Sequence, residues 1–276
     1  MESIKKYSHT TSSKLTRSIR GKEIAYIFQD PSTALNPLLT IGYQIKEVLK
    51  LHCNLRGKAA NNEVINLLTK VGINDPKKAM KMLPSEYSGG MRQRIVIAIA
   101  LASKPKILIA DEPTTALDVT VQKQIIELLL YLKKEMNLSM IFITHDLGLA
   151  SIIADNINVM YSGSFIEKGS KKDIFLNPLH PYTWALIASI PQFSEKNTSL
   201  FSLEGSPFPP EMDIKFDSFA PRNNYALKVD FFYSAPMFQI SPTHFVKSWL
   251  YSPNATPIQP PENVLNAIEC LKEVIK

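Results

Sequence analysis

Two adjacent carboxylates, Asp111 and Glu112, are the side chains in this sequence best placed to do chemistry. They follow residues 107–110, a short continuous apolar run that predicts a strand buried on both faces of a sheet. Open α/β sheets bind ligands at the end where such a strand emerges. There, one carboxylate can hold a magnesium ion while the next orients a water molecule. The pair is typical of a magnesium-nucleotide site, although two acidic residues after a strand also occur as a solvated turn.

A Ser-Gly-Gly turn, Ser88-Gly89-Gly90, precedes a helix that we expect over residues 91–102. The first N–H groups of a helix lack partners within the helix, and the helix dipole favours an anion at that end. Glycines also let the backbone approach a phosphate closely. These three residues are candidate phosphate contacts, and a capped helix start without any ligand is the alternative.

Gln29 and His145 each follow a predicted strand, at residues 23–28 and 140–143. A glutamine after a strand is nearly uninformative by itself, and a lone histidine is more often structural. Their sequence contexts, FQDP and THD, supply the specificity that the single residues lack.

The segments SGGMRQR, ILIADEPTTALD and ITHD resemble, in this order, the signature, the Walker B strand with its D-loop, and the H-loop of ABC transporter ATPases. Upstream, IFQDPSTALNP resembles the Q-loop of the same family. Downstream, VMYSGSFIEKG and NPLHPYTWAL resemble the oligopeptide and dipeptide importer branch. Tyr87 stands where the family usually has leucine; we expect little effect, because backbone amides carry the phosphate contact.

The resemblance implies an α/β fold, a P-loop NTPase-like ABC ATPase core with a helical subdomain at about residues 40–100. It implies ATP and Mg²⁺ as ligands, with Asp111 holding the metal through water and Glu112 polarising the attacking water. His145 would steady the γ-phosphate, and Gln29 would link the metal to a loop that contacts the membrane partner.

In the family, the signature turn of one subunit binds the γ-phosphate of the nucleotide held by the opposite subunit. The resemblance therefore assigns Ser88, Gly89 and Gly90 to the partner's nucleotide, and it places Asp118 in the D-loop. It implies a second ABC ATPase subunit, in a homodimer or a heterodimer, together with transmembrane permease subunits. An extracytoplasmic peptide-binding protein would act indirectly.

We expect an ABC nucleotide-binding domain over residues 1–190 and an irregular C-terminal extension over residues 191–276, where proline, serine and asparagine become frequent. The family's extension usually carries a cysteine cluster for iron–sulfur binding. This chain has two cysteines, Cys53 and Cys270, far apart in sequence, so we expect reduced thiols and no such cluster.

The sequence contains no G-x-x-x-x-G-K-[ST] motif, which in P-loop proteins wraps the phosphates. In the family this motif precedes the Q-loop by several tens of residues. We therefore expect an N-terminal truncation that removes the P-loop strand from the core. A sheet opened in this way exposes unpaired backbone groups, which predicts an isolated chain that is poorly soluble or only partly folded.

The composition is that of a globular protein, with 45% hydrophobic and 20% charged residues and a net charge of +6. The basic residues form no dense run, which argues against a nucleic-acid binder and permits contact with an anionic membrane surface. No apolar segment is long enough to span a bilayer, so we expect a peripheral protein at the cytoplasmic face of the plasma (inner) membrane.

The interpretation that follows is an ATP-hydrolysing subunit that energises oligopeptide or dipeptide import in a nucleotide-sandwich dimer. One alternative is a truncated, impaired subunit that donates its signature or binds its partners without hydrolysis. A nickel importer ATPase is another. A soluble ABC protein acting on ribosomes or DNA is disfavoured, because neither a second cassette nor a coiled-coil insertion is visible.

Overall fold

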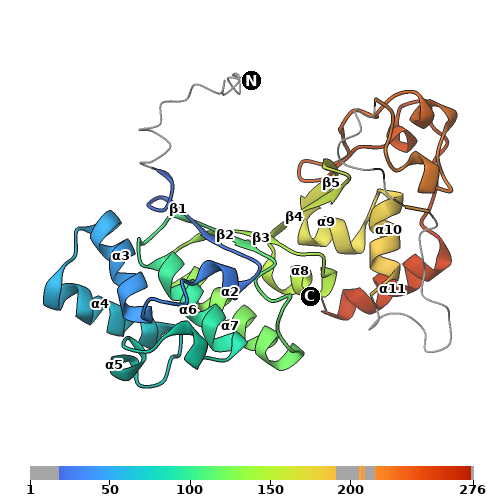
Figure 1. The fold of residues 1–276 in the computed structure, drawn as a ribbon. Helices are drawn as coiled ribbons and strands as arrows, with labels where there is room; N and C mark the ends of the chain where they lie inside the picture. Colours follow the sequence, from blue (N-terminus) through green and yellow to red (C-terminus); the bar gives the residue numbers. More distant parts are fainter. Residues whose placement is uncertain (1–18, 191–204, 207, 209–214, 275–276) are drawn as a thin grey trace. The chain divides into compact units, whose positions relative to one another are not determined.

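A computed structural model describes residues 19–190, 205–206, 208 and 215–274. The chain divides into two compact units, and the division falls between His145 and Asp146. Each unit has its own sheet (Figure 1). The boundary predicted from the sequence is a different one: it falls near residue 190, between the nucleotide-binding domain and the C-terminal extension. It stays a prediction.

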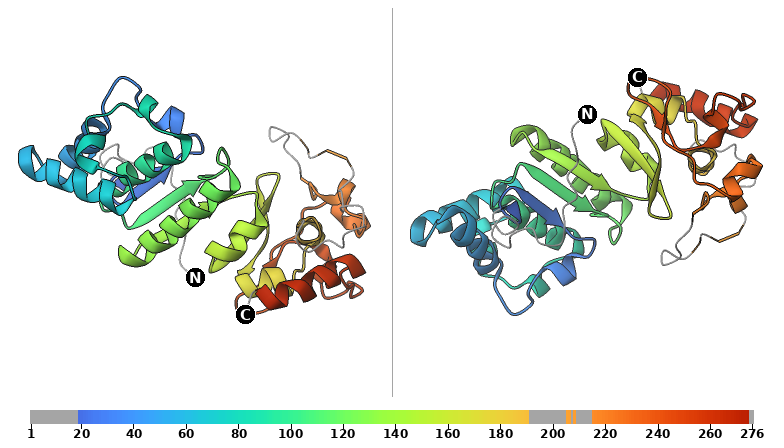
Figure 2. Two further views of the ribbon diagram at one scale, coloured as in Figure 1. Left: turned by 90° about the horizontal axis from the view of Figure 1, so that it is seen from below. Right: turned by 90° about the horizontal axis from the view of Figure 1, so that it is seen from above.

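The first unit contains a three-stranded parallel sheet in the order β1-β2-β3. The strands are β1 (Ile24–Ile27), β2 (Ile107–Asp111) and β3 (Ser139–Ile143), and they lie side by side in both views of Figure 2. Ile27 pairs with Ala110, and Asp111 pairs with Ile143. The carboxyl ends of all three strands therefore meet at one edge of the sheet.

Helices gather on one side of this sheet (Figure 1). They are α2 (Pro31–Ala34), α3 (Ile41–Cys53), α4 (Gly57–Lys70), α5 (Pro76–Ala79), the 3₁₀ turn η1 (Pro84–Glu86), α6 (Gly89–Leu101) and α7 (Val119–Glu135). Helix α6 is the central one, since it contacts α2, α3, α4, α7 and β1. The predicted helical region at about residues 40–100 corresponds to α3 through α6.

The two faces of the sheet differ in burial, which corrects the expectation that β2 is buried on both. Ala25, Leu108 and Ala110 point into the core with the helices and are at most 5% exposed. On the opposite face, Ile141 and Ile143 are 53% and 45% exposed. An apolar face of this kind is the structural basis for the predicted low solubility of the isolated chain, which stays a prediction.

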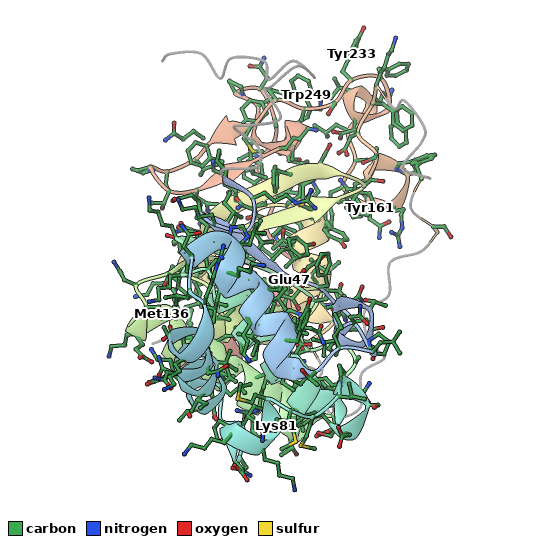
Figure 3. The ribbon with its side chains drawn as sticks, turned by 60° about the vertical axis from the view of Figure 1, so that its left-hand side comes forward. Glu47, Lys81, Met136, Tyr161, Tyr233 and Trp249 are labelled. Atoms are coloured by element: carbon green, nitrogen blue, oxygen red, sulfur yellow. The ribbon has the colours of Figure 1, made fainter. Side chains whose placement is uncertain are left out.

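Asp75-Pro76 has the residue types that start a helix, and Pro84 would end a helix started there, but α5 is shorter than that span. It ends at Ala79, and Pro84 begins η1 instead. The reason is tertiary: the carbonyls of Met80 and Met82 accept hydrogen bonds from the N–H groups of Gly42 and Ile41, at 2.9 Å each. The loop that contains Lys81 (Figure 3) therefore satisfies the first turn of α3 rather than continuing its own helix.

The second unit is built on an antiparallel sheet in the order β4-β5-β7-β6. Its elements are α8 (Leu147–Ile153), β4 (Asn156–Tyr161), β5 (Ser164–Ser170), α9 (Lys171–Leu176), α10 (Pro181–Ala188), η2 (Ala220–Arg222), η3 (Lys228–Phe231), β6 (Phe238–Gln239), β7 (Phe245–Val246), η4 (Trp249–Tyr251) and α11 (Glu262–Val274). Strands β4 and β5 form an antiparallel hairpin, and two short helices, α9 and α10, follow it along the chain.

The predicted irregular extension is only partly irregular. Strands β6 and β7 extend the hairpin sheet, and α11 is a helix of 13 residues. Val264 and Ile268 of α11 pack against Trp184 and Ala188 of α10. Buried residues recur along α11 at helical spacing, a signal in the sequence that the compositional argument missed. Tyr233 and Trp249 lie in this C-terminal segment (Figure 3), where the Trp249 indole Nε1 donates to the Tyr233 carbonyl at 3.0 Å.

A candidate nucleotide site at the carboxyl edge of the parallel sheet

Glu112 is the centre of a hydrogen-bonded group that joins the ends of all three strands. Gln29, which follows β1, donates from Nε2 to Glu112 Oε2 at 2.8 Å. His145, which follows β3, lies with Nδ1 3.0 Å from Glu112 Oε1. Thr115 donates from Oγ1 to Glu112 Oε2 at 2.9 Å. Three of the predicted site residues are thus brought together.

The backbone of Glu112 is in an unusual conformation, with φ of 43°. A non-glycine residue in the left-handed region costs about 1–3 kcal/mol and persists only where the surroundings hold it. The Glu112 N–H donates to the Ile143 carbonyl at 3.0 Å, which ties the residue to the end of β3. Such positions cluster at functional sites, which supports a role beyond a solvated turn.

The carboxylate of Glu112 is held in its charged form. Its pKa is lowered, first by the hydrogen bond from His145 and then by that from Thr115. Its side chain is 24% exposed, and that of His145 is 71% exposed. The site therefore presents an ionised carboxylate that a ligand or a water molecule can reach.

We predict that His145→Ala raises the pKa of Glu112, because the substitution removes the largest cause of its lowering. A depressed pKa keeps the carboxylate charged to lower pH, so raising it makes protonation begin at higher pH. The acidic limb of the pH–rate profile for ATP hydrolysis should shift upward in pH. His52→Ala, in α3, is the matched control, and an acidic limb that does not move in the His145 variant contradicts the prediction.

The side chain of Asp111 accepts a hydrogen bond from a residue of the neighbouring strand. Tyr26 of β1 donates from its hydroxyl to Asp111 Oδ2 at 2.5 Å. This hydrogen bond is also the first cause of a raised pKa for the Tyr26 phenol, so the tyrosine stays a neutral donor. Sequence reasoning missed both Tyr26 and Thr115. Thr115 lies within the ADEPTT segment, so its closeness to Glu112 in the sequence could have indicated it. The contact between Tyr26 and Asp111 could be predicted only with the register of β1 against β2.

The signature and D-loop residues form a second group, at the starts of α6 and α7. Ser88 accepts from the Met91 N–H at 3.4 Å, and Asp118 accepts from the Val121 N–H at 3.0 Å. Each residue therefore caps its helix. The two helix starts lie against each other, because a Cβ at Gly90 would overlap with Val121 Cγ1.

We predict that Gly90→Ala destabilises the first unit by about 1–3 kcal/mol, since the added methyl group must displace a stiff valine. Gly89→Ala is the matched control: its Cβ would lie at an ordinary 3.7 Å from Leu117 Cδ2, and alanine favours the helix by up to about 1 kcal/mol. Denaturant unfolding followed by circular dichroism measures both. Equal stabilities of the two variants would show that the contact with Val121 does not matter.

The side-chain oxygens at this edge are of the kind that magnesium prefers. Mg²⁺ is usually held by one or two carboxylates together with phosphate oxygens and water. Asp111 supplies a carboxylate and Gln29 an amide oxygen at the same edge of the sheet. Among the described residues, no group of three or more His, Cys, Asp or Glu is arranged to hold a metal ion alone. One carboxylate and one amide oxygen match the protein's share of a magnesium site that phosphate oxygens and water complete.

The fold is α/β, with a candidate site at the carboxyl edge of its parallel sheet, and comparisons with known proteins give its family. The family described as "ABC transporter" matches residues 2–115, and the family described as "Oligopeptide/dipeptide transporter, C-terminal region" matches residues 166–228. The chain belongs to the ABC transporter ATPases, in the group of oligopeptide and dipeptide transport ATP-binding proteins.

Three named relatives are similar to this chain over most of its length. The oligopeptide transport ATP-binding protein OppD of Bacillus subtilis is 51% identical over 92% of this chain and 71% of its own length. AmiE of Streptococcus pneumoniae, also an oligopeptide transport ATP-binding protein, is 47% identical over 95% of this chain and 74% of its own length. The dipeptide transport ATP-binding protein DppD of Lactococcus lactis is 48% identical over 90% and 72%.

Two solved structures share the fold. CbiO1 from Clostridium perfringens, part of an ABC transporter complex, is 29% identical with a TM-score of 0.50, over 56% of this chain and 60% of its own. The ATP-binding cassette MJ0796, solved as a dimer in a post-hydrolysis state with ADP and Pi, is 27% identical with a TM-score of 0.52, over 59% and 68%. Within the described residues, no helix is long and apolar enough to cross a membrane.

Proposed function

We propose that this chain is the ATP-binding subunit of an importer for oligopeptides or dipeptides, and that Asp111, Glu112, Gln29 and His145 form its hydrolytic group. The observation that carries the proposal is that Gln29, after β1, and His145, after β3, both contact the side chain of Glu112, after β2. The relatives named as oligopeptide and dipeptide transport ATP-binding proteins support the class of solute and do not support nickel.

Glu112 is proposed to polarise the water that attacks the γ-phosphate. An ionised carboxylate accepts a hydrogen bond from that water molecule. This raises the electron density on the water oxygen, the atom that attacks the phosphate. Gln29 and Thr115 hold Glu112 Oε2, while His145 holds Oε1. These contacts fix the direction of the carboxylate, and His145 is exposed enough to meet the phosphate as well. Bound Mg²⁺ would supply neutralisation of the phosphate charge, with Asp111 and Gln29 holding it.

Ser88, Gly89 and Gly90 are proposed to contact the nucleotide of a second ABC ATPase subunit, with Asp118 in the adjoining D-loop. The support is their position at the start of α6, the end of a helix that favours an anion. The dimeric structure of the ATP-binding cassette with ADP and Pi supports an assembly of two such subunits.

The partners that we propose are transmembrane permease subunits, contacted near Gln29, and indirectly an extracytoplasmic peptide-binding protein. This places the chain at the cytoplasmic face of the plasma membrane. The test is peptide uptake by membrane vesicles that contain the transporter assembled with this chain. Uptake that requires hydrolysable ATP on the side of this subunit supports the proposal, and uptake that continues without the chain refutes it.

A further inference from the structure

Tyr26 makes a hydrogen bond that no part of the ATPase assignment requires. It lies in the middle of β1 and pairs with Ile109 of β2, so its side chain is on the same face of the sheet as Asp111, two residues further along. Its hydroxyl reaches Asp111 Oδ2 at 2.5 Å. The ring also packs against Phe28, with the centroids 4.6 Å apart, which limits its movement.

A purely structural role accounts poorly for this bond. The bond lies on the exposed face of the sheet, where Tyr26 is 38% exposed, and water would satisfy both groups there. An exposed bond of this kind contributes little to stability. What it does determine is the rotation of the carboxylate, because one oxygen is held by a donor that is itself fixed by its strand and by Phe28.

We propose that Tyr26 is a positioning residue for the nucleotide-bound metal: by binding Oδ2, it directs Asp111 Oδ1 toward the magnesium ion or one of its waters. Residues that hydrogen-bond to a metal ligand orient that ligand, and their loss typically lowers metal affinity about 10- to 100-fold. This inference rests on the proposed function, since it requires Asp111 to face the metal.

The test uses the full chain in its assembled transporter, with Mn²⁺ as the metal probe and a non-hydrolysable ATP analogue at saturation. Free Mn²⁺ is measured by electron paramagnetic resonance, and nucleotide affinity is measured separately in EDTA. We expect Tyr26→Phe to raise the Mn²⁺ dissociation constant about tenfold while the metal-free nucleotide affinity is unchanged. Tyr43→Phe, the same chemical change at an exposed tyrosine of α3, should leave both constants unchanged.

A second background separates the possible failures. In an Asp111→Asn chain, Tyr26→Phe should produce no further loss of Mn²⁺ affinity, because the positioned group is already gone. If Asp111→Asn weakens Mn²⁺ binding and Tyr26→Phe does not, the positioning role is overturned while the proposed function stands. If the parent chain fails to bind the Mn²⁺–nucleotide complex, or Asp111→Asn has no effect, the metal site itself is refuted together with this inference.

Discussion

Glu112→Gln should lower ATP hydrolysis by the assembled transporter about 10²- to 10⁴-fold, the usual contribution of a positioned general base. The amide cannot accept a proton from water, yet it keeps nearly the shape of the carboxylate and one oxygen for Gln29 or Thr115. Nucleotide affinity should therefore change by no more than a few-fold. Phosphate release and equilibrium binding of a fluorescent ATP analogue, measured on the same preparation, separate these two quantities.

The matched control for this substitution is Glu127→Gln, the same change at an exposed position of α7. It should leave hydrolysis and affinity at the parent values. Parent-level hydrolysis in the Glu112 variant would show that this chain contributes no water-polarising carboxylate. A loss of binding that equals the loss of hydrolysis would place Glu112 in nucleotide binding instead.

Glu167→Ala should lower the free energy of unfolding of the second unit by about 3–5 kcal/mol, because it leaves several buried donors without an acceptor. Glu167, in β5, is fully buried. It accepts from the backbone N–H of Leu179 at 2.7 Å and that of His180 at 2.9 Å, and His244 Nε2 lies 2.8 Å from Oε1. The carboxylate thus joins the α9–α10 loop and the segment before β7 to the hairpin.

Tryptophan fluorescence measures this loss selectively, since the two tryptophans of the sequence, Trp184 and Trp249, both belong to the second unit. Glu167→Gln keeps one acceptor oxygen and should cost less than the alanine change. Glu269→Ala, at a side chain 69% exposed in α11, should stay within about 0.5 kcal/mol of the parent. A Glu167→Ala midpoint equal to that of the parent would contradict the account of the buried carboxylate.

The parts of the site that follow strand ends were predictable from sequence, and the contacts across elements were not. Asp111, Glu112 and His145 each follow an apolar run, and parallel strands place their carboxyl ends at one edge. The bond from Tyr26 depends on the register of β1 against β2, which no local pattern reveals. Likewise, the closeness of Gly90 to Val121 depends on how α6 and α7 cross.

The second unit shows a similar limit. Its hairpin was predictable from two short segments, at residues 157–161 and 164–168, joined around Gly163, whereas the pairing of Glu167 with His244 joins residues 77 positions apart. Helix α11 was not predicted because frequent proline, serine and asparagine in residues 191–276 indicated irregular structure, although apolar residues recur at helical spacing within α11. Helix α5 is short because carbonyl groups just after it accept hydrogen bonds from N–H groups at the start of α3. This tertiary effect is not encoded in the residues of α5 itself.

We propose that the carboxyl edge of β1, β2 and β3 binds and hydrolyses a magnesium nucleotide. A structure of the transporter assembled with the Glu112→Gln chain, in Mg²⁺ and ATP, tests it most directly. We expect intact ATP at this edge, with its metal beside Asp111 and its γ-phosphate facing residue 112 and His145. Nucleotide bound elsewhere on the chain, or none at this edge in a complex that binds ATP, would contradict it.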